Sequence, residues 1–276
     1  MTELTLAIGD TAIDVHQGDR LAGRYVYDDP FKPHLHPLCT PRGHTLTLKS
    51  PHDHPHHRGL MYALRTQDVN FWEERSTREG EAPGRQRHER FTTVIERGSR
   101  VGVDEAVTWL PADGGPTVFR ERRSLACAAL DEDRGYEWTW STELEAERDL
   151  TLIMSQWSAP RNDGTLVNYH GLGIRLRRDF GCTGGNALYL DGVETTFADG
   201  MGTTPTEAAF HGSIDGTWPV ARAGVALRQS HANALFALQS PFAFLSLGPT
   251  NLAPRTLSRG DRLVERYVVR VFDLPT

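Results

Sequence analysis

Apolar and polar residues alternate along most of this chain, and this period of two limits its fold more than any other feature. Leu4, Leu6 and Ile8 share one face of an extended segment, and the turn residues Gly9 and Asp10 follow them. Such alternation is typical of a β-strand with one buried face, and a tight turn between two strands predicts a hairpin. The pattern returns in residues 45–49, 91–96, 101–110, 117–129, 136–144, 150–155, 171–177, 187–190, 220–227, 235–239, 242–247 and 263–272.

Turn-rich connections separate these segments, and a helical period is confined to a turn or two near residues 69–78. Short strands at regular spacing predict an all-β protein, either a sandwich or a barrel. All-β chains of this length commonly fold as one unit. We therefore expect a large antiparallel two-sheet sandwich that forms a single domain over residues 1–276.

Composition excludes several classes of protein. The chain is 38% apolar and 24% charged, with a net charge of −6, so it resembles a globular protein that repels nucleic acid. The three cysteines, Cys39, Cys127 and Cys182, form no C-x-x-C pair, which argues against a disulfide framework or a cysteine zinc site. No signal-peptide pattern and no membrane-length apolar run is evident, so we expect a cytoplasmic protein without a membrane partner.

Histidine is concentrated in one segment. Seven of the twelve histidines lie between residues 34 and 57, and the densest part reads Ser-Pro-His-Asp-His-Pro-His-His-Arg-Gly-Leu over residues 50–60. Pro51 and Pro55 disfavour a helix and favour a stiff, extended loop. Imidazole titrates near neutral pH, so His54, His56 and His57 are candidates for acid–base catalysis.

The same segment suggests a metal site as an alternative. Imidazole is also a good ligand for divalent transition metals. His52, His54, His56 and, from a later segment, His88 could hold such an ion, although their spacing matches no established motif. This ion is the one cofactor that the sequence suggests. The dinucleotide-binding, phosphate-loop and serine-hydrolase motifs are all absent.

Two predicted strands carry polar residues on faces that should be apolar. Glu121 and Arg123 share a face with Leu125. A buried carboxylate must find a partner, so they form either a structural ion pair or part of a site within the fold. His170, which follows Tyr169, shares a face with apolar residues and is either a core residue or a further site residue.

Several of these motifs together resemble a known family. The stretch Asp-His-Pro-His-His-Arg-Gly-Leu at residues 53–60 and the stretch Asp-Val-Asn-Phe-Trp at residues 68–72 are similar to the signature of the bacterial PmoA-like family of unknown function. The stretches 41–43, 121–123, 169–175 and 260–263 fit the same signature. The family borrows its label from a methane-oxygenase membrane subunit, whose spanning helices this chain lacks.

The resemblance implies a role in carbohydrate metabolism, because members resemble proteins encoded beside sugar oxidoreductases. The all-β pattern is also compatible with the galactose mutarotase-like supersandwich, in which a histidine and a glutamate open and close a sugar ring. The histidines of this chain do not match the mutarotase motif, so that mechanism transfers as an analogy alone.

We therefore expect an enzyme that binds a small carbohydrate, either a sugar or an oxidised sugar, and transfers protons as an epimerase, isomerase, lyase or hydrolase. The predicted catalytic residues are His54, His56, His57, Glu121 and His170, and the predicted substrate-binding residues are Arg58, Trp72, His88, Arg123 and Tyr169. The alternatives are a metal-dependent enzyme with the His-cluster ion and a non-catalytic sugar-binding subunit. A homodimer is compatible with the sequence.

Overall fold

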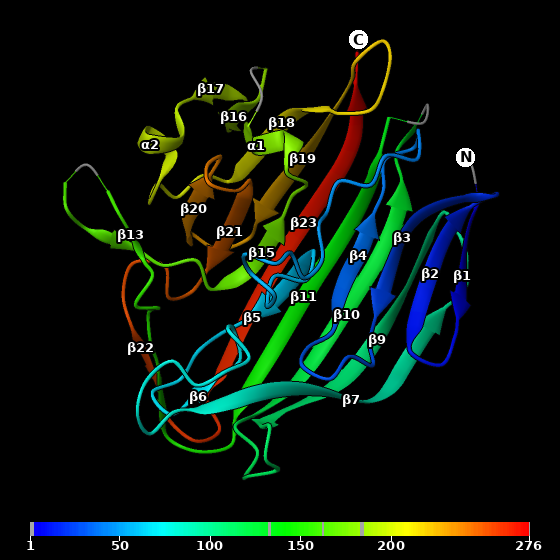
Figure 1. Cartoon of the computed structure of the whole chain (residues 1–276). Helices are drawn as coiled ribbons and strands as arrows, with labels where there is room; N and C mark the ends of the chain where they lie inside the picture. Colours follow the sequence, from blue (N-terminus) through cyan, green and yellow to red (C-terminus); the bar gives the residue numbers. More distant parts are fainter. Residues whose placement is uncertain (1–2, 132–133, 162, 183–184, 276) are drawn as a thin grey trace.

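The computed structural model describes residues 3–131, 134–161, 163–182 and 185–275, which fold into two large β-sheets (Figure 1). The first sheet has nine strands in the order β20-β21-β15-β5-β4-β3-β2-β1-β8. These strands are β20 (Ala234–Leu238), β21 (Phe244–Gly248), β15 (Gly171–Arg175), β5 (Leu60–Ala63), β4 (His34–Leu38), β3 (Arg20–Val26), β2 (Ala12–Gln17), β1 (Leu4–Ile8) and β8 (Arg97–Gly98).

The second sheet has ten strands in the order β17-β16-β18-β19-β23-β11-β10-β9-β7-β6. These strands are β17 (Val193–Thr195), β16 (Ala187–Leu190), β18 (Glu207–Ile214), β19 (Ala221–Gln229), β23 (Arg262–Leu274), β11 (Tyr136–Ala146), β10 (Phe119–Ala129), β9 (Arg100–Pro111), β7 (Ala82–Ile95) and β6 (Val69–Asn70). Its pairs are antiparallel except for the short parallel pair of β6 and β7.

Small elements complete the structure. Two short ribbons pair β12 (Leu150–Leu152) with β22 (Arg255–Leu257) and β13 (Ala159–Pro160) with β14 (Leu166–Val167). The helices α1 (Asp179–Cys182) and α2 (Phe197–Gly200) have four residues each. Within the described ranges, no helix has the length and apolar character needed to cross a bilayer.

The two-sheet, all-β prediction is confirmed, whereas two local predictions are wrong. Residues 45–49 form isolated bridges, such as that between Thr47 and Leu176, and not a continuous strand. Residues 69–78 contain no helix: β6 ends at Asn70, and the chain then continues without regular structure. Phe71, Trp72 and Glu73 in this second segment are buried, and Glu73–Arg75 line the cavity described below.

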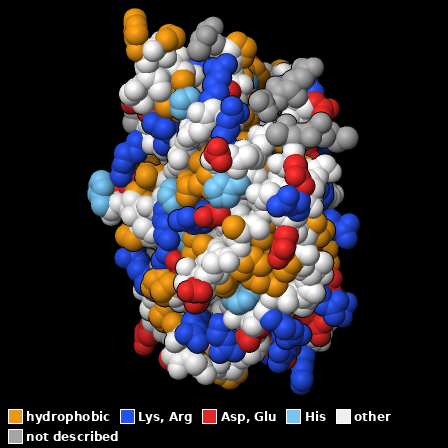
Figure 2. All heavy atoms as spheres, turned by 90° about the vertical axis from the view of Figure 1, so that its right-hand side faces the viewer, with side chains coloured by type: hydrophobic (Ala, Val, Ile, Leu, Met, Phe, Trp, Pro, Cys, Tyr) orange, Lys and Arg blue, Asp and Glu red, His pale blue; other side chains and the backbone are white. Residues whose placement is uncertain are grey.

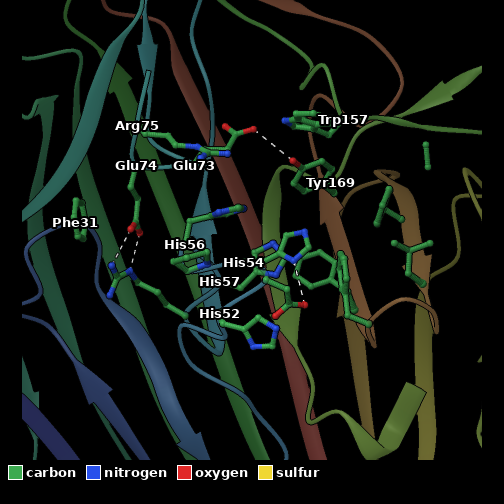
Figure 3. Close-up of a pocket in the computed structure, with 18 residues that line it drawn as sticks. Phe31, His52, His54, His56, His57, Glu73, Glu74, Arg75, Trp157 and Tyr169 are labelled. Carbon is green, nitrogen blue, oxygen red and sulfur yellow. Dashed lines mark hydrogen bonds and ion pairs between the residues drawn. The ribbon is translucent and has the colours of Figure 1, made fainter. Parts of the chain in front are cut away.

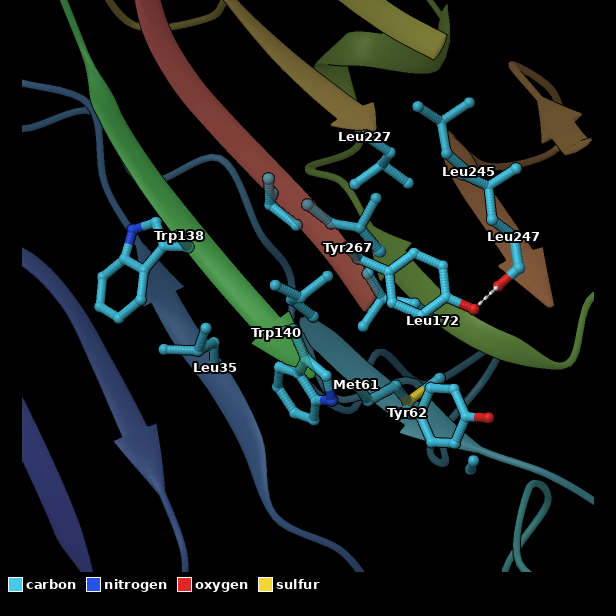
Figure 4. Packing of buried hydrophobic residues seen from close by; sticks show 14 of the residues in the cluster. Leu35, Met61, Tyr62, Trp138, Trp140, Leu172, Leu227, Leu245, Leu247 and Tyr267 are labelled. Carbon is cyan, nitrogen blue, oxygen red and sulfur yellow. Dashed lines mark hydrogen bonds between the residues drawn. The ribbon is translucent and has the colours of Figure 1, made fainter. Parts of the chain in front are cut away.

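The core lies between the two sheets and is rich in aromatic residues (Figure 4). Trp138 and Trp140 of β11 are 1% and 0% exposed, as strand alternation predicts for one buried face. Leu172, Leu245 and Leu247 of the smaller sheet belong to the same core. The residues that alternate with these leucines along β15 and β21 therefore point away from the core. The site lies on the face that they form.

The surface turned toward the viewer in Figure 2 carries acidic and basic side chains that are interspersed, with apolar atoms visible between them. This mixture of signs agrees with the small net charge of the chain.

Candidate functional site

A cavity of about 750 Å³ lies on the face of β15, β20 and β21 that points away from the core (Figure 3). Gly173 at the middle of β15 has no side chain, and a Cβ there would lie 2.9 Å from Trp72 and 2.7 Å from Phe244. The strand therefore leaves room for aromatic rings above it. Three loop regions complete the wall; the lining residues are Phe31, His52–Arg58, Glu73–Arg75, Trp157, Ala159, Tyr169, Phe236, Leu238, Phe242 and Phe244.

The histidine segment reaches this cavity through two tight turns and not as the straight, extended loop that its prolines predicted. The amide of Ser50 donates to the carbonyl of His57 over 2.7 Å, which closes the segment at its base. Within it, the amide of His54 donates to Pro51 and the amide of His57 donates to His54, each over 3.0 Å. The turns bring the imidazoles of His54, His56 and His57 together, and His52 lines the same cavity.

These three imidazoles pack against one another. The rings of His54 and His57 are stacked with centroids 4.7 Å apart, and the ring of His56 meets His57 edge-on at 4.6 Å. His57 also stacks on Phe244 at 4.9 Å. Such packing fixes the rings, and it leaves the Nε2 atoms of His56 and His57 buried without a hydrogen-bond partner among the described residues.

Burial keeps these imidazoles neutral. It lowers the pKa of His56 to about 2 and the pKa of His57 well below its usual value, because the charged form loses its hydration. The pKa of His54, which is half-buried, is lowered for the same reason. Near neutral pH these imidazoles are therefore uncharged and can serve as hydrogen-bonding groups.

Asp53 and two arginines support the histidines from one side. Asp53 accepts from Arg175 over 2.9 Å and from Arg178 over 3.0 Å. Burial alone would raise the pKa of Asp53, but the hydrogen bond and charge of Arg175 outweigh it and hold the carboxyl below its usual range. Arg175 in turn contacts His57 Nδ1 at 3.2 Å.

Glu73 supplies the carboxylate of the site, and the sequence analysis missed it. One oxygen, Oε1, accepts from the hydroxyl of Ser155 over 3.2 Å and from that of Tyr169 over 3.4 Å. The guanidinium of Arg65 lies 3.8 Å from the same oxygen. The other oxygen, Oε2, is buried with no hydrogen-bond partner among the described residues. Figure 3 shows Glu73 and Tyr169 pointing toward each other across the cavity.

Arg58 lines the cavity, but its guanidinium is committed to the protein. It makes a two-point ion pair with Glu74 over 2.7 and 2.8 Å and donates to Asp29 over 3.0 Å. The fully buried Lys32 lies 3.0 Å from the same Glu74 carboxylate. This network joins three parts of the chain and fixes the wall, so Arg58 acts more as a support than as the substrate clamp that we predicted.

Arg75, by contrast, lines the cavity, is exposed and makes no hydrogen bond or ion pair with any residue that the structure describes. Its charge is close enough to His56 to contribute to the lowered pKa of that imidazole. Arg75 was not among the predicted binding residues, and it is the cavity-lining cation best placed to bind a ligand.

Trp72 and His170 lie behind the lining residues. The Trp72 ring contacts those of Tyr169 and His170, with centroid distances of 5.2 Å in both cases. Burial lowers the pKa of His170 to about 3. Trp72 Nε1 and both ring nitrogens of His170 lack a well-aligned partner among the described residues. Of these predicted site residues, Tyr169 reaches the cavity directly and the other two support it.

Glu121 and Arg123 do not line the cavity, which corrects the expectation that they share a pocket with the histidines. Glu121 accepts from Trp109, Arg123 and Thr142 over 2.6–2.8 Å, so both of its oxygens are satisfied within the core. Arg123 also donates to Gln86 over 2.8 Å. The observed arrangement is the structural ion pair that the sequence analysis left open.

His88 also lies outside the cavity. Its Nδ1 lies 2.6 Å from Glu105, and its ring packs on Tyr27 and Phe91. The predicted metal set of His52, His54, His56 and His88 is therefore not brought together. Across the described parts of the chain, no three His, Cys, Asp or Glu side chains converge in a way that could hold a metal ion.

Aromatic rings form the rest of the wall. Trp157 is 59% exposed at the mouth, and Phe236 and Phe242 lie deeper. Phe242 packs on His54 with ring centroids 4.4 Å apart, and Phe236 contacts Tyr169 at 5.4 Å, so aromatic rings lie directly beside the polar residues of the wall. None of these three apolar residues was predicted, because no periodic pattern distinguishes them from core residues.

Comparison with known proteins gives a family and several weak structural likenesses. The model of a family described as "Family of unknown function (DUF6807)" matches residues 12–275. No curated protein matches the sequence significantly.

Three of the similar solved structures show how weak these likenesses are. A protein described as a kojibiose phosphorylase from human microbiome has 9% identity and a TM-score of 0.34, with 69% of this chain and 22% of that one covered. The heparan sulfate lyase HepC mutant from Pedobacter heparinus has 10% identity and a TM-score of 0.34, with 96% and 34% covered. A protein described as an aldose 1-epimerase from Escherichia coli K12 has 10% identity and a TM-score of 0.28, with 99% of both chains covered. This chain therefore spans well under two thirds of the first two.

Proposed function

The chain belongs to a family of unknown function, DUF6807, whose model spans almost all of it, and from this premise we propose that it is a carbohydrate-active enzyme. Its substrate would be a sugar or an oxidised sugar, and its chemistry would be proton transfer by Glu73 with help from the neighbouring histidines. The PmoA-like resemblance is part of this proposal, since it is what connects the sequence with sugar metabolism.

One observation carries the proposal. The buried atoms His56 Nε2, His57 Nε2 and Glu73 Oε2 lack hydrogen-bond partners among the described residues, and all three side chains line one cavity. An unsatisfied buried polar atom costs about 1–3 kcal/mol, so a cluster of them is maintained where a polar ligand can satisfy it.

The shape of the wall indicates what kind of polar ligand fits. A sugar ring has hydroxyl groups along its edge and C–H groups on its faces. The cavity offers hydrogen-bonding atoms from the histidines and Glu73, and aromatic rings from Trp157, Phe236 and Phe242, within one wall. Cavities with a mostly apolar lining and a few converging polar groups are typical ligand sites.

The carboxylates that line the cavity narrow the reaction. Asp53 is held by Arg175 and Arg178, and Glu74 is held by Arg58 and Lys32. Glu73 alone among the described cavity-lining carboxylates keeps a buried oxygen without a partner. Hydrolysis by two facing carboxylates needs a second such group, so we favour proton transfer at one carbon, as in an isomerase, epimerase or lyase.

The test compares variants on a panel of aldoses, ketoses and 3-keto-glycosides. Removing the base by Glu73→Gln should lower kcat about 10²–10⁴-fold, the usual contribution of a general base. The matched control is Glu79→Gln, which changes an exposed carboxylate of the same loop that does not line the cavity.

His57→Ala should also reduce turnover, because it removes both a ring nitrogen of the cavity and the packing of His54. Equal turnover by the wild type and Glu73→Gln would show that Glu73 is not the base. If the wild type bound a panel sugar tightly but did not turn it over, the protein would be a sugar-binding protein and not an enzyme.

A further inference from the structure

The contact between Arg175 and His57 determines where the proton of this imidazole lies. An arginine guanidinium has donors only and stays charged in proteins. Because Arg175 Nη1 lies 3.2 Å from His57 Nδ1, Nδ1 must accept the hydrogen bond and cannot carry a proton. A neutral imidazole then carries its proton on the other nitrogen, Nε2.

Arg175 is itself held in place from two sides. Asp53 accepts from its Nη2 over 2.9 Å, and the guanidinium lies over the ring of Phe242 at 4.3 Å from the centroid. The side chain is 0% exposed and comes from the last residue of β15. The arginine therefore has no room to turn away and release His57 Nδ1.

Protonation of His57 at both nitrogens is also opposed. A second proton would have to be placed on Nδ1, against a guanidinium at hydrogen-bond distance. Burial and the neighbouring charges act in the same direction on the pKa of His57. His57, which lines the cavity, thus remains one neutral tautomer whose buried Nε2–H group has no partner among the described residues.

We propose that Arg175 locks His57 as a permanent Nε2–H donor toward a carbonyl oxygen of the ligand, so that the substrate is the keto or aldehyde form of a sugar. This inference rests on the proposed function. In this inference His57 stabilises the negative charge that develops on the carbonyl oxygen, and Arg175 positions His57. Glu73 transfers the proton.

The charges behind His57 favour an oxygen that becomes negative. Two arginines, Arg175 and Arg178, share the single carboxylate of Asp53, which leaves a net positive charge next to the imidazole. A hydroxyl group gains little from this field, whereas a carbonyl that becomes an enolate gains much in a buried site. Neutral imidazole is known to polarise carbonyls in this manner.

The step that follows is enolisation. A C–H bond next to the carbonyl breaks, and its proton moves to Glu73 Oε2. The electron pair of that bond forms a C=C bond, and the carbonyl electrons move to oxygen, which accepts the hydrogen bond from His57 Nε2. Transfer of the proton from Glu73 to the former carbonyl carbon, while the hydroxyl proton of the first carbon passes to the enolate oxygen, completes an isomerisation without any other reactant.

The first experiment measures the tautomer by ¹⁵N NMR of histidine-labelled protein between pH 5.5 and 8.5. We expect His57 Nδ1 to keep a pyridine-type shift and Nε2 a pyrrole-type shift throughout this range. Arg175→Met should abolish this pattern and produce a mixture of tautomers, whereas Arg175→Lys, which keeps a donor, should restore it. Arg178→Gln is the matched control and should leave the pattern unchanged.

The wild-type spectrum alone can contradict the proposed fixed tautomer of His57, so the test does not depend on whether a variant folds. A mixed, Nδ1-protonated or doubly protonated His57 in the wild type would do so.

The second experiment titrates the wild type with methyl 3-keto-α-D-glucopyranoside and with methyl α-D-glucopyranoside. We expect the His57 Hε2 signal to move downfield with the keto compound alone, and the keto compound to exchange its α-hydrogens in D₂O. Binding of both compounds with no movement of Hε2 would overturn the carbonyl assignment and leave the proposed function standing. Failure of every sugar of the panel to bind or react, with the tautomer locked, would instead contradict the proposed function.

Discussion

Three buried imidazoles have lowered pKa values that link the stability of the fold to pH. Burial lowers the pKa of His34 and His170 to about 3 and that of His56 to about 2. In the unfolded chain the same side chains titrate at their ordinary value of about 6.5. Below that value, the unfolded state takes up protons that the folded state does not bind, so the stability present above pH 6.5 is lost as the pH falls toward 3.

This linkage predicts that the free energy of unfolding decreases between pH 6.5 and pH 5. Each buried histidine contributes up to about 1.4 kcal/mol per pH unit in this range. His170→Gln should therefore flatten the pH dependence by up to that amount, because glutamine takes up no proton. Urea unfolding of both proteins at several pH values measures the slopes, and His231→Gln, which changes an exposed histidine, is the control. Identical slopes for wild type and His170→Gln would contradict the prediction.

Single residues also show why the site could be predicted in part. His54, His56 and His57 were found because they cluster in the sequence. Glu73 was missed because its partners Ser155 and Tyr169 lie 82 and 96 positions away, and nothing in its own segment repeats. The one available signal was its position directly after the stretch Asn-Phe-Trp at residues 70–72, which belongs to the family-like signature.

At the level of elements, β10 illustrates what alternation reveals and what it leaves open. The period of two correctly placed Glu121 and Arg123 on the buried face, since they are 2% and 1% exposed. It could not show which residues they meet, because Trp109 and Thr142 come from the two neighbouring strands and depend on the register. The sequence therefore could not show whether Glu121 and Arg123 form a structural ion pair or part of a site.

Arg123→Met should strongly destabilise the fold. Removing one partner of a buried ion pair leaves the other charge uncompensated, at a cost of about 3–5 kcal/mol. Ligand binding by the fraction that remains folded should be unchanged, because neither residue lines the cavity. Chemical denaturation and calorimetric titration measure the two effects. A stable Arg123→Met protein that has lost ligand binding would argue for a direct role in the site.

The contact between β15 and β21 controls the position of Tyr169 and His170. Gly171 has a φ of +103°, and a Cβ on Gly248 would overlap the backbone of His170. Both positions therefore require glycine. Gly248→Ala should push the strands apart, destabilise the protein and weaken ligand binding through Tyr169, whereas Gly9→Ala in the first hairpin, where a Cβ has room, should do neither. Thermal unfolding and binding of the panel sugars test this pair of variants.

Seen as a whole molecule, the site lies on the side of the smaller sheet that the sandwich does not use for its core. Residues of β20 and β21 line the cavity, and so do residues just before β5 and β15. These four neighbouring strands come from distant parts of the chain. The sandwich could be predicted because long strands such as β10 and β11 alternate buried and less buried residues. The cavity could not, because it depends on the order of the strands and on loops that carry no pattern.

The uneven exposure of the tryptophans has a practical consequence. Trp72, Trp109, Trp138 and Trp140 are 0–1% exposed, whereas Trp157 is 59% and Trp218 is 93% exposed. A soluble quencher such as acrylamide should therefore reach the last two alone. In the variant Trp218→Phe, all remaining quenching reports on the mouth of the cavity, and a bound sugar that covers Trp157 should suppress it. Fluorescence can thus detect a sugar bound in the cavity without any measurement of turnover.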